Sequence, residues 1–73
     1  MERKEELLRK FGRQLKILRK QKGLSVRELA LEARLDTEQV RRIEAGKVNL
    51  LLSTILALAR GLDIPPDELL RAL

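Results

Sequence analysis

The sequence predicts an all-α fold, in which five helices form one compact bundle in a single domain of 73 residues. Apolar residues recur at intervals of three and four along the chain, and the two-residue alternation typical of strands is missing. Glycine, proline or a helix-capping residue separates the periodic segments, which indicates short turns between helices. Cysteine and histidine are absent, so neither a disulfide nor a zinc site can stabilise so small a core. Regular helix packing must therefore supply the stability.

The first two helices are indicated by an apolar stripe and by a cap. The first is expected over about 3–21, where leucines and Phe11 share one face and Lys and Arg residues the other. A glycine ends it. The second is expected over 26–33, because Ser25 and Glu28 have the spacing of a capping box.

The third helix is expected over 37–45. Asp36 and Gln39 form a second box-like cap at its start, and a glycine follows its end. Its inward positions are Val40 and Ile43, which are three residues apart. The charged residues of the segment therefore fall on its outer face.

The last two helices are expected over 52–62 and 66–72. The fourth is expected to supply core residues, which are Ile55, Leu56, Leu58, Ala59 and Leu62. Pro66 stands in the first turn of the fifth, where its missing N–H costs nothing. The acidic residues after it suit the positive end of the helix dipole.

The net charge of +5 is concentrated at the start of the chain and favours a polyanionic partner. Residues 1–22 carry nine Lys or Arg against three Glu, whereas the remainder is nearly neutral. No apolar stretch is long enough to span a membrane, and the N-terminus lacks the apolar core of a signal peptide. If the protein is natural, a cytoplasmic, nucleoid-associated location is expected. A basic helix lying on an anionic membrane is disfavoured, because the apolar face of 1–22 is needed for the core.

No set of residues in the sequence supports catalysis. Four hydroxyl side chains are all explained as helix caps or helix surface: Ser25, Thr37, Ser53 and Thr54. No nucleophile stands beside a base, and no metal-binding cluster is recognisable. We therefore expect no enzyme activity, no cofactor, no metal and no small-molecule substrate.

Two helix starts lie eleven residues apart, at Ser25 and Asp36, with a turn of about two residues between the helices. So short a turn makes the helices cross steeply, and Ala30 and Ala33 supply the small side chains needed where they touch. This spacing is typical of a helix-turn-helix, whose second helix protrudes from the domain.

The residues from about Phe11 to Leu70 resemble the phage-repressor class of helix-turn-helix domains, the Cro/cI or XRE family. The resemblance is carried by "FGRQLKILRKQKGLSVRELA", "RIEAGKVN" and "LSTILALARGLDIPPDELL". It implies a lambda-repressor-like fold and sequence-specific binding of double-stranded DNA by a transcription regulator. It also implies that the helix 37–45 lies in the major groove.

The resemblance implies a role for individual residues. Base edges would be contacted by Thr37, Glu38 and Arg42, and Arg41 would reach base or backbone. Phosphates would be contacted by Ser25, Val26, Arg27, Arg34, Lys47 and Asn49, with Arg13 and Lys22 as weaker candidates. Arg19 and Glu44 would form a partly buried salt bridge that holds the third helix in place.

Three positions depart from the pattern of the family. Val26 stands where the family usually has Gln, which removes one usual phosphate contact. Arg34 stands where Gly is usual, and a left-handed backbone there would cost about 1 kcal/mol. Leu50 and Leu51 replace a common Pro-Ser, and they predict either a homodimer interface or a cap on the core of a monomer.

Two further questions stay open at this level. The same fold can serve as a protein-binding module of antitoxin or adaptor type, which the two leucines favour and the outward arginines disfavour. The clean caps and strong helix formers are also typical of designed scaffolds, so the composition fits a designed DNA-binding module as well as a small natural regulator.

Overall fold

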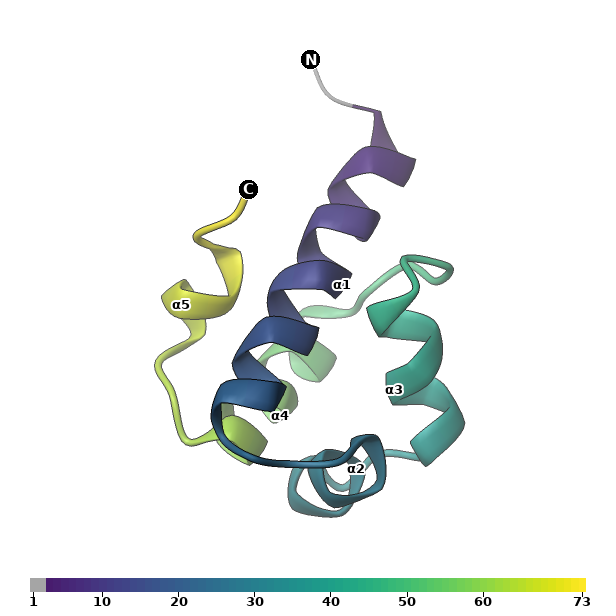
Figure 1. Ribbon diagram of the computed structural model, residues 1–73. Coiled ribbons are helices and arrows are strands. Elements are labelled where there is room, and N and C mark those ends of the chain that lie inside the picture. Colours follow the sequence, from purple (N-terminus) through teal and green to yellow (C-terminus); the bar gives the residue numbers. More distant parts are fainter. Residues whose placement is uncertain (1–2) are drawn as a thin grey trace.

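The structure is a computed structural model that describes residues 3–73. Within this range the all-α prediction is confirmed, and the helices are α1 (Lys4–Gln21), α2 (Val26–Ala33), α3 (Thr37–Glu44), α4 (Leu52–Leu62) and α5 (Pro66–Leu70). α3 and α5 flank α1 on opposite sides, α2 closes the lower end of the bundle, and α4 runs behind α1 (Figure 1). The Cα radius of gyration is 11.0 Å. None of these helices is long and apolar enough to cross a membrane.

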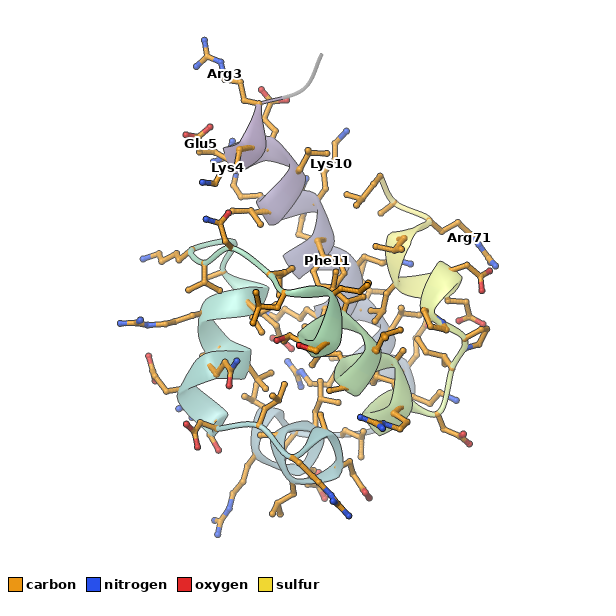
Figure 2. The ribbon with its side chains drawn as sticks, turned by 180° about the vertical axis from the view of Figure 1, so that it is seen from behind. Arg3, Lys4, Glu5, Lys10, Phe11 and Arg71 are labelled. Atoms are coloured by element: carbon orange, nitrogen blue, oxygen red, sulfur yellow. The ribbon has the colours of Figure 1, made fainter. Side chains whose placement is uncertain are left out.

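The core is one cluster of aliphatic side chains packed around Phe11. Every helix contributes to it, and its most deeply buried members are Phe11, Leu15, Leu29, Val40, Leu58, Leu62 and Leu69. Figure 2 shows Phe11 inside the bundle, whereas Arg3 and Glu5 project from the N-terminal end of α1. Burial of each large apolar side chain is worth about 1.5–3 kcal/mol. The core therefore holds all five helices in one arrangement.

The turn between α2 and α3 contains a left-handed residue that is not glycine. Arg34 has φ 59° and ψ 43°, and the next N–H, that of Leu35, bonds back to the carbonyl oxygen of Ala30 at 2.8 Å. Ala30 and Ala33 are buried where α2 meets its neighbours. This turn directs α3 away from α2 and leaves its outer face uncovered.

One of the two predicted caps is present and the other is wrong. Ser25 Oγ accepts a hydrogen bond from the Glu28 N–H at 3.0 Å, and Glu28 Oε1 accepts one from the Ser25 N–H at 2.8 Å. Asp36 has the extended backbone of an N-cap, but its side chain makes no capping bond. Because Asp36 lies at the surface, water can satisfy the first N–H groups of α3 in its place.

Two helices end earlier than the sequence predicts. The helix expected over 37–45 ends at Glu44, with Ala45 as its C-cap. The helix expected over 66–72 ends at Leu70, and only a turn bond from the Leu73 N–H to the Leu70 carbonyl follows it. The last residues are exposed, so no packing energy holds a further helical turn.

Candidate nucleic-acid interface

α3 is divided into a buried face and a charged outer face. Val40 and Ile43 are 0% and 2% exposed, so they anchor α3 to the core. On the opposite side the side chains of Glu38, Arg41 and Arg42 are each more than 60% exposed. These three side chains can therefore meet a partner without any change in the core.

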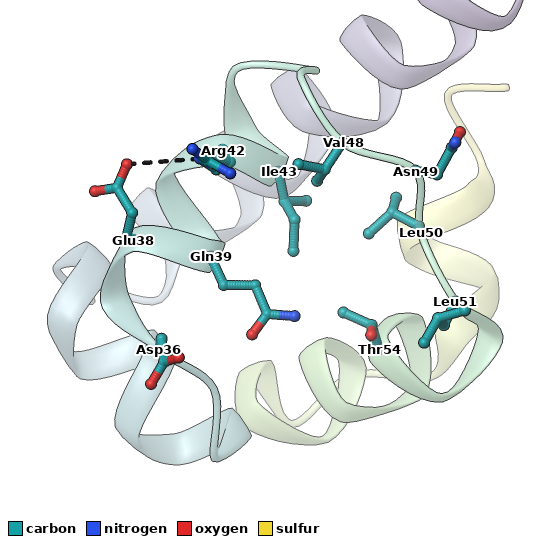
Figure 3. Close-up of a pocket in the computed structure, with 10 residues that line it drawn as sticks. All are labelled: Asp36, Glu38, Gln39, Arg42, Ile43, Val48, Asn49, Leu50, Leu51 and Thr54. Atoms are coloured by element: carbon teal, nitrogen blue, oxygen red, sulfur yellow. Dashed lines mark ion pairs between the residues drawn. The ribbon is translucent and has the colours of Figure 1, made fainter.

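Glu38 links the two arginines of this face. Its carboxylate lies 3.7 Å from Arg41 Nη1 and 3.9 Å from Arg42 Nε, and Figure 3 shows the second of these ion pairs. Exposed pairs of this kind contribute about 0–1 kcal/mol. They are too weak to withhold either arginine from a stronger acceptor.

The N-terminus of α2 lies beside α3. Ser25 and Arg27 are exposed there. The side chain of Val26 packs against the core instead, so only its backbone N–H remains for an anion. The pKa of Glu28 is lowered, chiefly by the hydrogen bond from the Ser25 backbone N–H and further by the Ser25 hydroxyl, so the capping carboxylate stays charged.

Lys16 of α1 belongs to this surface, and the sequence reasoning missed it. It lines a hollow of about 360 Å³ between α1, α2 and α3, together with Val26 and Arg41. The sequence places Lys16 on the polar face of α1 but does not show which part of that face adjoins α3. Arg13, a weaker candidate for phosphate contact, instead lines a separate hollow with Ala72 next to α5. It therefore lies apart from α3.

The remaining basic and polar candidates flank the two helices. Arg34 is exposed in the turn before α3, whereas Lys47 and Asn49 are exposed in the segment after it. Lys47 also lines a shallow hollow with Arg41 and Arg42. Lys22 is exposed at the C-terminal end of α1. Cationic side chains thus border α3 at both of its ends.

A buried ion pair joins the end of α3 to α1. Arg19 Nε donates to Glu44 Oε2 at 2.6 Å and Arg19 Nη2 to Glu44 Oε1 at 3.1 Å, and both side chains are 8% exposed. Arg19 Nη1 also donates to the carbonyl oxygen of Leu24 at 2.8 Å. Both side chains are nearly buried in one wall of the hollow that Lys16 and Arg41 line, and the geometry of the pair suits a role in holding α3.

The two leucines after α3 point in different directions. Leu50 is half-buried and packs against the core, whereas Leu51 is 71% exposed. Leu52 and Leu56 of α4 continue the exposed apolar surface beside Leu51. The prediction that Leu56 lies in the core is therefore wrong, since its side chain is 44% exposed. A hollow of about 380 Å³ separates this surface from α3, and Arg42 and Leu51 lie on its opposite walls (Figure 3). Residues 3–73 contain no cluster of side chains suited to hold a metal ion.

A protruding helix with a charged outer face, bordered by cations and by a helix N-terminus, defines a helix-turn-helix DNA-binding domain. The chain belongs to the helix-turn-helix family HTH_3, whose model matches residues 15–69. The function of the chain is accordingly sequence-specific DNA binding, as predicted.

Solved structures of regulators are similar to the chain. The restriction-modification controller protein C.AhdI from Aeromonas hydrophila has 48% identity over 85% of this chain and 94% of its own, with a TM-score of 0.83. The controller protein C.Esp1396I has 26% identity over 90% of each chain, with a TM-score of 0.81. An HTH_3 family transcriptional regulator from Vibrio cholerae has 25% identity over 94% of this chain and 39% of its own, with a TM-score of 0.89. No curated protein matches the chain in sequence.

Proposed function

We propose that α3 enters the major groove of DNA and reads base edges there. The observation that carries this proposal is the division of α3 into an anchored inner face and an exposed outer face. An α-helix fits the major groove, where each base pair presents a distinct pattern of donors and acceptors. We call α3 the reading helix from here on.

The outer side chains match particular base edges. Arg42 suits guanine, whose O6 and N7 accept both arms of a guanidinium, and Glu38 suits cytosine, whose N4 donates. Thr37 is half-buried at the start of the helix, so its hydroxyl or methyl group reaches only a closely apposed base. A carboxylate repels phosphates, so Glu38 favours discrimination between sequences over general affinity.

The phosphate contacts come from the ends of α2 and α3. Arg27, Arg34 and Lys47 are exposed around the reading helix, and Ser25 and Asn49 offer polar contacts beside them. Such contacts position the domain and supply most of the salt-dependent affinity. Lys16 joins this group because it shares a hollow with Arg41.

A second copy of the chain is the proposed partner of the exposed leucines. Leu51, Leu52 and Leu56 form a patch that we call the leucine patch, and a two-fold axis through it would bury the same side chains from both copies. Leu51 lies across one hollow from Arg42, so the two reading helices would lie close to the two-fold axis. Half-sites about one helical turn apart would result.

The similarity to restriction-modification controller proteins suggests the process that is regulated. C.AhdI shares 48% of its residues with this chain over nearly all of its length. We propose that this chain is likewise a controller protein of a restriction-modification system, and that it acts there as a transcription regulator.

Selection from a randomised duplex library at near-physiological salt tests the reading helix. One motif should be enriched. Arg42→Ala should then relax one position of it at a cost of about 1–3 kcal/mol, because a bidentate contact to one base is lost. Lys47→Ala should weaken all sequences alike and reduce the salt dependence. If no motif emerges, or if Arg42→Ala weakens every sequence equally, α3 does not read bases.

A further inference from the structure

The end of α3 touches α1 backbone to backbone. Gly12 of α1 is buried at this contact. A Cβ atom on Gly12 would lie 2.4 Å from the carbonyl oxygen of Glu44 and 2.5 Å from that of Ile43. Atoms do not approach so closely, so only a residue without a side chain allows α1 to lie against α3 here.

A second glycine forms the same kind of contact in the opposite direction. Gly46, just after α3, has φ +72°, and a Cβ atom there would lie 2.9 Å from both the Cα and the backbone N of Arg9. Each segment therefore presents one glycine to the backbone of the other. The Arg19–Glu44 ion pair lies in the same region and adds a charged link between the two helices.

We propose that Gly12 and Gly46 are positioning residues for base recognition, because their backbone contacts set the tilt of the reading helix in the major groove. We call this pair of contacts the glycine seam. The proposal rests on the proposed role of α3. Neither glycine touches DNA in it, and each acts through the side chains that α3 carries.

The size of the displacement supports this role. To bring a Cβ atom of Gly12 from 2.4 Å to even 3.0 Å, α1 and the end of α3 must separate by about 0.6 Å. Recognition constellations tolerate errors of only about 0.5 Å. The opposing atoms belong to the backbone of Ile43 and Glu44, so no flexible side chain can absorb the shift.

The shift is not uniform along α3. Arg42 lies next to Ile43, so it moves with the displaced end of the helix. Thr37 lies at the other end, which the hydrogen-bonded turn after α2 holds. A side chain at Gly12 should therefore disturb the base pair that Arg42 reads more than the pair that Thr37 reads.

The test compares four forms of the full chain: the parent, Arg42→Ala, Gly12→Ala and Leu69→Val. Leu69 is fully buried in α5, which packs on α1 and α4 and makes no comparable contact with α3, so its variant controls for a general loss of stability. The affinity of each form is measured for the selected site and for single base-pair changes in it. Measurements are made at a temperature at which circular dichroism shows all four forms to be folded.

Gly12→Ala should lower discrimination at the position read by Arg42 by about tenfold, within the range that one good base contact supplies, and should largely spare the position read by Thr37. Leu69→Val should lower the melting temperature without changing the ratio of the affinities for the selected and the altered site at either position. If Gly12→Ala and the parent have equal ratios of affinities while Arg42→Ala loses discrimination, the glycine seam proposal alone is overturned. No loss in Arg42→Ala would overturn the reading role of α3, and the seam proposal with it.

Gly46→Ala serves if Gly12→Ala does not fold. Its Cβ atom would lie 2.9 Å from the Cα and the backbone N of Arg9, so it opens the glycine seam from the other side and by a smaller displacement. Discrimination at the Arg42 position should fall, by less than in Gly12→Ala. A melting temperature that falls while discrimination at both positions stays at the parent values would reject the proposal.

Discussion

Within residues 3–73, two residues other than glycine adopt a left-handed backbone, and substituting them distinguishes the effect of backbone strain from the effect of a lost DNA contact. Arg34 has φ 59° and Asp63 has φ 56°. A left-handed conformation costs a residue with a side chain about 1–2 kcal/mol, and aspartate less than most. A glycine at such a position relieves this strain. It also lowers the free energy of unfolding by about 0.5–1 kcal/mol, because glycine has more conformational entropy to lose when the chain folds. The two effects largely offset each other at both positions.

Arg34→Gly should therefore leave the free energy of unfolding unchanged or raise it by up to about 1 kcal/mol, yet weaken DNA binding. The loss of affinity should be similar for all sequences and should shrink as salt is added, because a phosphate contact is lost. Asp63→Gly is the matched control, since Asp63 follows α4 and is not one of the candidate DNA contacts. Equal affinities for the two variants, measured by titration at two salt concentrations, would remove Arg34 from the interface.

At the level of a single helix, the capping box of α2 makes a prediction about pH. The pKa of Glu28 lies below its ordinary value of 4.5 in the folded chain, mainly through the hydrogen bond from the Ser25 N–H. A carboxyl group with a lowered folded pKa stabilises the fold above its unfolded pKa and loses that contribution as the pH falls through the folded value. The contribution of Glu28 is therefore complete near neutral pH and disappears in acid below 4.5.

Glu28→Gln removes this titration but keeps a side chain that can cap the helix. The variant should be less stable than the parent near neutral pH, and the difference should narrow as the pH falls below 4.5. Denaturant unfolding at a series of pH values measures this difference in the free energy of unfolding. Glu32→Gln, on the same helix but outside the cap, should follow the parent curve. A constant difference between Glu28→Gln and the parent at every pH would show that the cap does not depend on charge.

The arrangement of the helices also decides how the whole molecule assembles. Leu51 in the leucine patch and Leu31 on α2 are each 71% exposed, so they form a matched pair for substitution. Leu51→Glu should convert the proposed dimer to a monomer, because it buries a charge in the interface. Leu31→Glu should leave the dimer intact. Light scattering across a range of concentrations distinguishes the two, and a parent that stays monomeric at every concentration would rule out the dimer in the absence of DNA.

Much of this molecule could be predicted from local patterns. The period of the apolar residues, the S-x-x-E spacing at Ser25 and the glycine after each of the first and third helices are properties of neighbouring residues, and they indicated where the helices lie. The family resemblance then pointed to the outer face of α3. The structure shows that the three charged residues of this face, Glu38, Arg41 and Arg42, are exposed.

The features that sequence reasoning missed depend on contacts between distant segments. Leu50 and Leu51 are adjacent leucines, and only the course of the chain over the core decides that one packs inward and the other faces solvent. The sequence places Lys16 on a polar face, but the crossing of α1 and α3 brings it next to Arg41.

The sequence by itself determined the helical class and the short turn of the helix-turn-helix, because periodicity and spacing are properties of neighbouring residues. Its charge indicated a polyanionic partner, and the family resemblance implied that this partner is DNA. Only the tertiary structure decided how the reading helix is held. Nothing in the local sequence sets Gly12 apart, because its close contact with Ile43 and Glu44 exists only in the folded chain. Close backbone contact between two helices is a property of their packing, and no local pattern encodes it.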